Sequence, residues 1–292
     1  MLISRGEKIF NVINSIFLIL VALLCIAPMV YMLAVSVSGN AQVVAGNVSF
    51  WPEKFTLASY EYLLSLGSFW NSMLISVERV VISLVFTLVF TALTAYPLSK
   101  SSTKFLGRTF FAWYFFIPML INGGLIPTYL TISSLKLLGT IWALILPSTV
   151  VTFYVILMLN FFRGIPGEIE EAALIDGAGQ WRILFGIYLP LSLPSLATIA
   201  VYCSLGQWNE WFNGIIYMND PSQYPLMSYL QIAVLNVNLD ELSPEEAAKL
   251  SQIGTQTYKA AQLFVAAIPM ICVYPFLQKY FTKGLTLGSV KG

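Results

Sequence analysis

The segment from Ile165 to Ala178 reads IPGEIEEAALIDGA, and the organisation of the whole chain can be worked out from it. Pro166 suits the first turn of a helix, where its missing N–H costs nothing. Three carboxylates follow near the positive end of the helix dipole: Glu168, Glu170 and Glu171. Gly177 can adopt the left-handed conformation that ends a helix. We therefore predict a short helix with small and apolar residues on its contact surface.

A helix lying on the membrane surface is the alternative for this segment. Such helices usually carry Lys or Arg on the polar face, whereas this one carries carboxylates. A short, rigid helix with small residues suits insertion into a cleft on another protein, and we favour that interpretation.

The rest of the chain is apolar. Of its 292 residues 58% are hydrophobic and only 10% are charged, whereas soluble domains carry about 25% charged residues. Lipid is the solvent that this composition requires. The net charge of +1 gives no reason to expect nucleic acid as a partner. Because the chain has no histidine, the commonest metal ligand is missing, and we expect no metal site.

A membrane helix needs about 20 mostly apolar residues, and six segments meet this requirement. They are residues 10–35 and 71–98, one segment between Arg108 and Lys136, one between Lys136 and Arg163, residues 194–217, and one between Lys259 and Lys279. The first lacks the cleavage site of a signal peptide and is expected to be an uncleaved helix. We predict an all-α integral membrane protein with six transmembrane helices.

Lysines and arginines set the orientation, because cytoplasmic loops carry an excess of them. With the N-terminus in the cytoplasm, ten of the 15 lie inside and four lie outside. We therefore predict that both termini are cytoplasmic. The predicted parts are a cytoplasmic N-terminus at 1–9, a transmembrane domain at 10–292, external loops at about 36–69 and 218–258, a cytoplasmic loop at 163–190 and a cytoplasmic tail at 279–292.

The second external loop contains a predicted helix start. Pro244 fits the first helical position after Ser243, and Glu246 completes a capping box. Four carboxylates near this start are candidate docking residues for an external partner: Asp240, Glu241, Glu245 and Glu246. A solvated connector is the other interpretation of a loop of this length, and both stay open.

The cytoplasmic segment has a specific resemblance. The run EAA at 171–173, the pair Asp176-Gly177 and the run IYLP at 187–190 together resemble the EAA loop of permease subunits of ABC importers. In that family the loop is the coupling helix that docks on the ATPase subunit. The resemblance implies a type I ABC importer transmembrane domain. It also implies a coupling role for six residues: Glu170, Glu171, Ala172, Ala173, Asp176 and Gly177.

Other segments resemble the carbohydrate-uptake branch of that family, including permeases for alginate-type oligosaccharides. They are AYPLS at 95–99, GGLIP at 123–127, WNEWF at 208–212 and PFLQKYF at 275–281. The resemblance implies a bacterial cytoplasmic (inner) membrane location and an oligosaccharide substrate. The implied partners are a second permease subunit across a pseudo-two-fold axis, two ABC ATPase subunits and an extracytoplasmic solute-binding protein.

The sequence lacks a GxxxxGK[S/T] phosphate-binding loop. We therefore expect that the chain is not an enzyme and binds no cofactor, with ATP and Mg held by the partner ATPase. An ion-coupled secondary transporter of a small polar solute is the alternative from another class. It predicts more intramembrane carboxylates and an internal repeat, and neither is visible in the sequence.

A candidate substrate path lies on the fifth predicted span. Polar residues there fall at neighbouring helix positions and are predicted to form one stripe, with aromatic rings beside it. Amides and carboxylates can bond sugar hydroxyls, and rings can stack on sugars. The candidate path residues are Asn209, Glu210, Asn213, Trp208 and Trp211. A subunit interface for the polar groups and a membrane-interface belt for the tryptophans stay open.

Two further features lie inside predicted spans. Glu78 and Arg79 are charges within the second span, which are costly in lipid, and each is expected to pair with another helix. Gly123 and Gly124 lie within the third span. They indicate close helix packing or a loosened helix, and we favour close packing.

Overall fold

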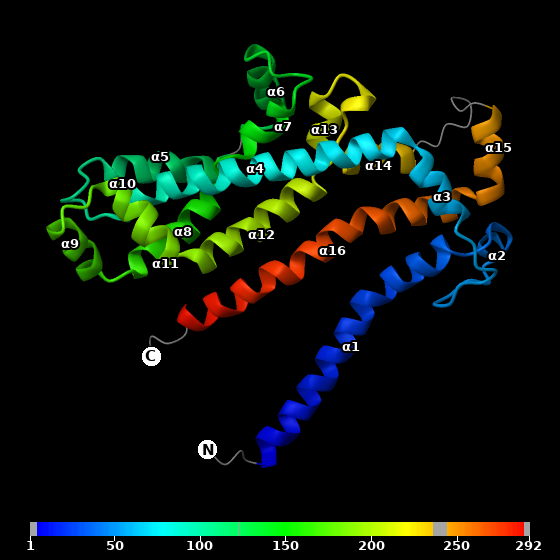
Figure 1. Cartoon of the computed structure of the whole chain (residues 1–292), viewed down its shortest axis with the longest axis horizontal. Coiled ribbons are helices and arrows are strands. Elements are labelled where there is room, and N and C mark those ends of the chain that lie inside the picture. Colours follow the sequence, from blue (N-terminus) through cyan, green and yellow to red (C-terminus); the bar gives the residue numbers. More distant parts are fainter. Residues whose placement is uncertain (1–4, 122, 236–243, 289–292) are drawn as a thin grey trace. The chain divides into compact units, whose positions relative to one another are not determined.

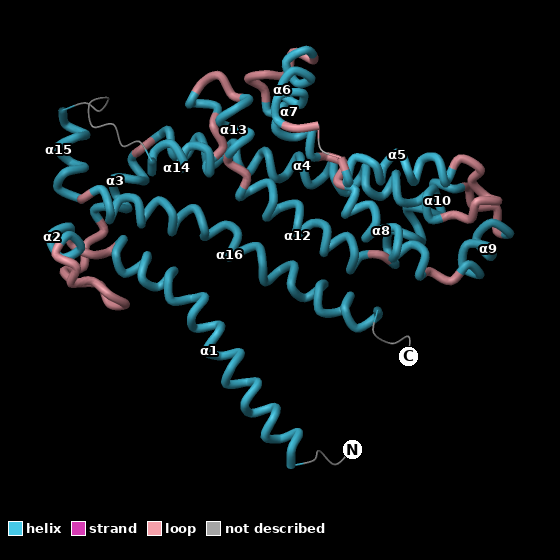
Figure 2. The backbone as a smooth tube through the Cα atoms, turned by 180° about the vertical axis from the view of Figure 1, so that it is seen from behind, coloured by secondary structure: helices cyan, strands magenta, loops and turns pink. Residues whose placement is uncertain are grey.

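The computed structural model describes residues 5–121, 123–235 and 244–288. Within these ranges the chain is helical and contains no strand (Figures 1 and 2). The prediction of an all-α protein is therefore confirmed. The described chain forms two compact units, one from the residues up to Trp70 together with Ile232–Pro269, the other from Asn71–Gln231 and the residues from Met270 on.

The first unit holds the N-terminal helix and the first part of the last helix. Its helices are α1 (Arg5–Ser36), α2 (Asn40–Val44), α3 (Ala58–Ser65), α15 (Pro244–Ile253) and the beginning of α16 (Thr255–Gly288). A small apolar cluster joins the end of α1 to α2 and α16: Ala34, Val35, Val43, Val48 and Ala260. The earlier apolar side chains of α1 are exposed, so this helix requires lipid or another protein around it.

The second unit contains the remaining helices: α4 (Gly67–Ser99), α5 (Arg108–Leu120), α6 (Leu125–Ser134), α7 (Ile141–Ile145), α8 (Thr152–Gly164), α9 (Gly167–Ile175), α10 (Gln180–Ile183), α11 (Leu189–Leu191), α12 (Leu193–Asn209), α13 (Phe212–Tyr217) and α14 (Leu226–Leu235). Helices α4 and α14 extend slightly beyond it. Short 3₁₀ turns η1 (Leu146–Ser148) and η3 (Pro221–Gln223) and a π-helical turn η2 (Leu184–Tyr188) complete the chain. Helices α5 and α12 both contact α8.

The main buried cluster lies where the end of α4 meets α8, η2 and α12. Its members are Ala95, Tyr96 and Leu98 from α4, Val155, Met158 and Phe162 from α8, and Ile183, Leu184, Tyr188 and Ile199 from the segment that follows α9. Residues up to 104 positions apart, Ala95 and Ile199, therefore converge in one cluster. The loop that carries α9 extends from this packed end.

Among the described residues, only α1 and α4 are individually long and apolar enough to cross a membrane. Three more candidates are pairs of helices separated by a bend: α5 with α6, α7–η1 with α8 at 48°, and α10–η2–α11 with α12 at 77°. Prolines lie beside the last two bends: Pro147 in η1 and Pro194 in the first turn of α12. Since proline lacks the N–H that a helix interior requires, these residues favour a bend at both places. The described chain thus holds two spans, or up to five if each pair counts as one. The sixth predicted interval lies within α16, and the total of six stays a prediction.

The expectation of close packing at Gly123 and Gly124 is wrong. The chain leaves helical geometry there, and Gly124 has φ +85° just before α6. A Cβ added at either residue would meet nothing within 4 Å. The glycines therefore loosen the helix, since a left-handed residue interrupts the hydrogen-bond ladder and glycine adopts that conformation without steric cost.

Close packing does occur at another glycine, Gly214 in α13. A Cβ at this position would collide with the hydroxyl of Ser228 and lie 2.9 Å from its Cβ and 3.0 Å from Cδ of Pro225.

We expect Gly214→Ala to destabilise the protein by about 1–3 kcal/mol through overpacking. Gly206→Ala in α12 is the matched control, since nothing lies within 4 Å of its added Cβ and alanine favours a helix. The measurement is the melting temperature of each purified variant in detergent; equal temperatures would contradict the expected crowding.

Candidate functional site

The predicted short helix exists as α9, Gly167–Ile175. Pro166 is its N-cap instead of its first helical residue. Gly177 has φ +75°, and the backbone N–H of Ala178 donates to the carbonyl of Ala173 at 2.9 Å. This is the left-handed glycine ending expected from the sequence. The helix therefore stops sharply at Ile175, and the left-handed Gly177 lies two residues further on.

Most of the candidate coupling residues lie on the outside of the protein. Glu171, Ala172, Asp176 and Gly177 are exposed, and Ala173 is half-buried. Ile175 is 85% exposed, so an apolar side chain lies uncovered next to the exposed Asp176. Helix α9 thus presents a small mixed apolar and acidic surface of the kind that another protein can cover.

Glu170 differs from the other candidate coupling residues. It is only 5% exposed, and its carboxylate lies 3.0 Å from Nζ of Lys100, immediately after α4. Two consecutive glutamates therefore point to different surroundings: Glu170 is bound within its own chain and Glu171 faces outward.

A second polar cluster lies inside the apolar part of the second unit, around Arg79 of α4. The Arg79 side chain is 1% exposed and forms an ion pair with Glu210, at 2.8 Å between Nη2 and Oε2. Its Nε donates to Oε1 of Gln207 at 3.0 Å, and its Nη1 donates to the Glu210 carbonyl at 3.2 Å. The guanidinium is therefore surrounded by acceptors, as a buried charge requires. The expectation that Arg79 pairs with another helix segment is confirmed.

The expectation for Glu78, its neighbour in sequence, is wrong within the described chain. Glu78 is exposed and has no ion-pair partner among the described residues. It lines a cavity of about 140 Å³ together with residues of α4, α7 and the η3 region.

The predicted polar stripe on the fifth span is not one helix face. Helix α12 ends at Asn209, and Glu210 has extended backbone angles of φ −76° and ψ 115°. A new helix, α13, starts at Phe212. Oε1 of Glu210 accepts the backbone N–H of Asn213 at 2.8 Å. The interruption is therefore stabilised by Glu210 itself, because its carboxylate satisfies an otherwise unpaired donor at the start of α13.

The candidate path residues separate into two groups. Asn209 and Trp211 are exposed, and Asn213 is half-buried. Trp208 is only 3% exposed, and Glu210 is engaged by Arg79. Asn209 and Trp211 are open to contacts from outside this chain, whereas Trp208 is packed inside it and Glu210 is bonded to Arg79.

Sequence reasoning missed Gln207 and Ser148. The amide of Gln207 accepts from Arg79 and donates to Oγ of Ser148 at 2.7 Å, so it links α4 to the η1 bend. An amide side chain directly before Trp208, the first residue of the predicted path, was the available signal. Its partners are 59 and 128 residues away, and no local pattern indicates them.

Two of the four candidate docking residues fall outside the described chain. Asp240 and Glu241 lie outside the described residues. Helix α15 begins at Pro244, as the capping pattern predicted, and its first turn contains Glu245 and Glu246. Their docking role stays a prediction.

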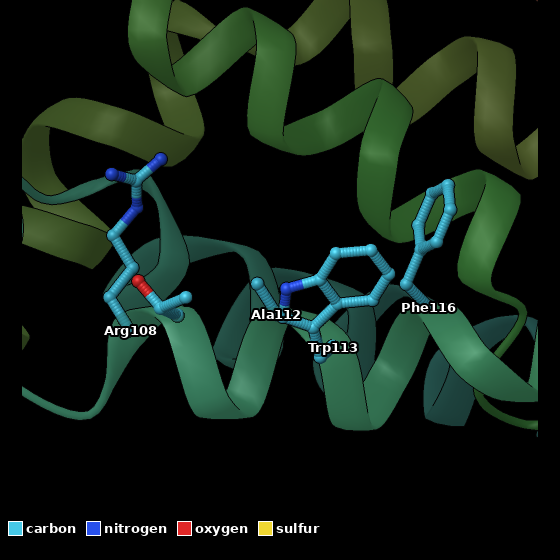
Figure 3. A pocket seen from close by; sticks show the side chains of 5 residues that line it. Arg108, Ala112, Trp113 and Phe116 are labelled. Atoms are coloured by element: carbon cyan, nitrogen blue, oxygen red, sulfur yellow. The ribbon is translucent and has the colours of Figure 1, made fainter.

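A cavity of about 360 Å³ lies along α5 (Figure 3). It is lined by Arg108, Thr109, Ala112, Trp113 and Phe116. All five residues come from one helix, so the cavity is an exposed groove and includes none of the candidate site residues.

Known proteins share the sequence and fold of this chain over nearly its whole length. Residues 4–287 match the family described as binding-protein-dependent transport system inner membrane component. The chain is 38% identical to Protein LplC of Bacillus subtilis (strain 168), over 99% of this chain and 97% of that protein. It is also 38% identical to the polygalacturonan/rhamnogalacturonan transport system permease protein YtcP of the same organism, over 98% and 99%. A chain in the crystal structure of a bacterial ABC transporter involved in the import of the acidic polysaccharide alginate superimposes with a TM-score of 0.88 at 32% identity, covering 96% of this chain and 99% of that one.

The buried ion pair leads to a double-mutant prediction. Glu210→Ala leaves the buried Arg79 guanidinium without its counter-charge, and we expect a loss of about 3–5 kcal/mol of stability. Arg79→Leu removes the other partner. Because the two residues share one interaction, the double variant should lose less stability than the two single losses added together. Glu78→Gln, which alters the exposed neighbour, is the control and should leave the melting temperature in detergent unchanged. Additive losses would show that the pair is not coupled.

Proposed function

The chain belongs to the family of binding-protein-dependent transport system inner membrane components, and we propose that it is the permease subunit of an ATP-driven importer of acidic oligosaccharides derived from polysaccharides. The observation that carries the proposal is α9, which exposes Glu171, Ala172 and Ile175 just before the left-handed Gly177. Such a helix is built for contact with another protein. An ion-coupled secondary transporter, the alternative from the sequence, is a different class of protein from this family.

In the proposed mechanism α9 is the coupling helix. ATP and Mg are held by two ABC ATPase subunits, and the chain itself binds no cofactor. Glu171 offers its carboxylate to a basic group on the ATPase, while Ala172 and Ile175 provide apolar contact. Movement of the ATPase subunits is passed through α9 to the packed end of α4, α8 and η2, because the loop that carries α9 extends from that cluster. The membrane helices then alternate between outward and inward access.

The substrate class follows from the relatives. One is named as a permease for polygalacturonan and rhamnogalacturonan, and the matching structure belongs to an importer of the acidic polysaccharide alginate. We therefore propose uronide-containing oligosaccharides as the substrates. Asn209 and Trp211, exposed at the interruption after α12, are the proposed path-lining residues. An amide replaces the hydrogen bonds that sugar hydroxyls lose with their water, and a ring face stacks on the sugar.

The proposed assembly needs partners on three sides. A second permease subunit related by a pseudo-two-fold axis completes the path and covers the exposed apolar surface of this one. A solute-binding protein delivers the sugar on the outer side, where the carboxylates at Asp240, Glu241, Glu245 and Glu246 are the candidate contacts. Six transmembrane helices with both termini in the cytoplasm complete the proposed topology in the bacterial cytoplasmic membrane.

Glu171→Ala tests the coupling role. Loss of a charge-assisted contact at a protein interface should reduce transport by about tenfold or more, while the amount of chain in the membrane stays normal because Glu171 is exposed. Glu168→Ala is the matched control, since Glu168 is an exposed carboxylate at the start of the same helix. The measurements are sugar uptake and ATPase stimulation by the binding protein in reconstituted vesicles. Full uptake by Glu171→Ala would contradict the proposal.

Asn209→Leu and Glu210→Leu test the separation of the path residues. Asn209→Leu should lower transport per assembled complex several-fold, because hydroxyls entering the path lose a hydrogen-bond partner. Glu210→Leu should instead lower the yield of folded protein, because it leaves Arg79 without its counter-charge. The measurement is uptake divided by the amount of complex in vesicles. Normal uptake per complex for Asn209→Leu would place that residue outside the path.

A further inference from the structure

The ammonium group of Lys100 lies in a closed site between the end of α4 and the coupling helix α9. Its Nζ is 3.0 Å from Oε2 of Glu170, and the Lys100 side chain is only 9% exposed. Lysine is seldom buried without a partner, so this position requires specific compensation. The groups around it come from three separate segments of the chain.

Two aromatic rings face the ammonium. Nζ of Lys100 lies 3.9 Å from the ring centroid of Tyr96 and 4.1 Å from that of Tyr188. The two rings pack edge to face, with their centroids 5.0 Å apart, and Phe162 packs against both. A cation over an aromatic face is attracted by the ring quadrupole, most strongly where water is excluded. The rings therefore fix the position of Nζ as well as stabilising its charge.

The tyrosine hydroxyls extend this site into neighbouring elements. The Tyr188 hydroxyl donates to Oε2 of Glu170 at 2.8 Å, and the Tyr96 hydroxyl donates to Oε1 of Gln180 at 2.7 Å. Tyr188 is the last residue of the π-helical turn η2. Such turns shift the residues that follow relative to a regular helix and are frequent at functional sites. Glu170 is thus held from α4 through Lys100 and from η2 through Tyr188.

The carboxylate of this site is ionised at neutral pH. Burial by itself would raise the pKa of Glu170, but the bonds from Lys100 and Tyr188 outweigh it and hold the pKa below its ordinary value. Burial lowers the pKa of Lys100, and Glu170 opposes that shift. Because the Glu170 pKa is lowered by folding, its stabilising contribution is present above the ordinary carboxyl pKa and is lost as the pH falls through the lowered one.

We propose that Lys100 is a positioning residue for energy coupling: it fixes α9 to the cytoplasmic end of α4, so that the two move together. The proposal rests on the proposed function of α9. It explains why Glu170 faces inward while Glu171, next to it, is free for an ATPase subunit. Without the Lys100 site, α9 would keep the packing of Ala173 on the buried cluster and the Tyr188 bond to Glu170, but it would lose its direct ion pair with the residue that follows α4. Part of the displacement of α9 would then be taken up by its flanking loops instead of by α4.

Lys100→Met in the complete importer, reconstituted with its ATPase and binding protein, tests this role. Methionine keeps most of the apolar stem and removes the charge. We expect the sugar transported per ATP hydrolysed to fall about tenfold, the effect of losing hydrogen bonds to a charged group, with the yield of complex retained. Lys104→Met is the matched control: Lys104 is 48% exposed and its Nζ is 3.8 Å from Glu170, so transport per ATP should stay at the wild-type level. A wild-type ratio for Lys100→Met overturns the proposal.

Tyr188→Phe provides a milder variant in case Lys100→Met fails to fold. It keeps the ring over the ammonium and removes only the hydroxyl that donates to Glu170. We expect a smaller fall in sugar transported per ATP, in the same direction. A lower melting temperature with an unchanged ratio would mean that the site only stabilises the fold, and the proposal would be overturned.

A distance measurement separates this proposal from the proposed function. Spin labels at the exposed positions Ser101 and Glu168, in a chain whose three native cysteines are replaced by alanine, report the distance from the end of α4 to α9. Lys100→Met should broaden that distance distribution, whereas Lys104→Met and Glu171→Ala should not. If Glu171→Ala leaves transport intact, the coupling function fails while the distance result still decides whether Lys100 positions α9. An unchanged distribution in Lys100→Met overturns the positioning role.

Discussion

The buried guanidinium of Arg79 is the interaction on which the geometry of the second unit depends. In apolar surroundings an interrupted helix leaves backbone donors and acceptors that no water can satisfy. Helix α12 stops at Asn209, and Arg79 donates to the Glu210 carbonyl at this interruption while pairing with the Glu210 carboxylate. The other carboxylate oxygen accepts the Asn213 N–H. The interruption therefore supplies the acceptors that the buried Arg79 guanidinium needs, and Arg79 in turn satisfies a carbonyl that the interruption leaves unpaired.

The cluster around Lys100 follows the same rule. Lys100 cannot be buried alone, and Glu170, Tyr96 and Tyr188 supply the charge and the ring faces that it needs. Because Glu170 is used within the chain, the surface of α9 that remains for a partner begins at Glu171. Both polar clusters start from α4, one near its middle and one just after its end. This helix therefore connects the helix interruption beside the proposed path to the proposed ATPase contact.

Local features could be predicted from the sequence, and long-range ones could not. Helix α9 and its ending at Gly177 follow from residues within one short segment, as does the start of α15 at Pro244. The bonds from Arg79 to Gln207 and Glu210 join residues 128 and 131 positions apart. The residues from Asn209 to Trp211 contain no proline or glycine to indicate that a helix stops there. The interruption is stabilised by Arg79 on another helix. Because no local pattern reveals that contact, the sequence predicts one helical stripe where the structure has two separate helices.

The proposed acidic substrate explains why Glu210 should be neutralised. An unpaired carboxylate beside the path would repel a uronide, and in a medium of low dielectric constant that repulsion is strong. Arg79 neutralises the Glu210 carboxylate, at 2.8 Å between Nη2 and Oε2. The pairing also occupies the guanidinium of Arg79, which in its free form would bind an anionic sugar too tightly to release it. The wall of the proposed path would then present the uncharged amide of Asn209 and the indole ring of Trp211, both of which are exposed. Neutral hydrogen bonds and ring contacts are weak enough to be exchanged from one sugar to the next, which movement of a chain of sugars along a path requires.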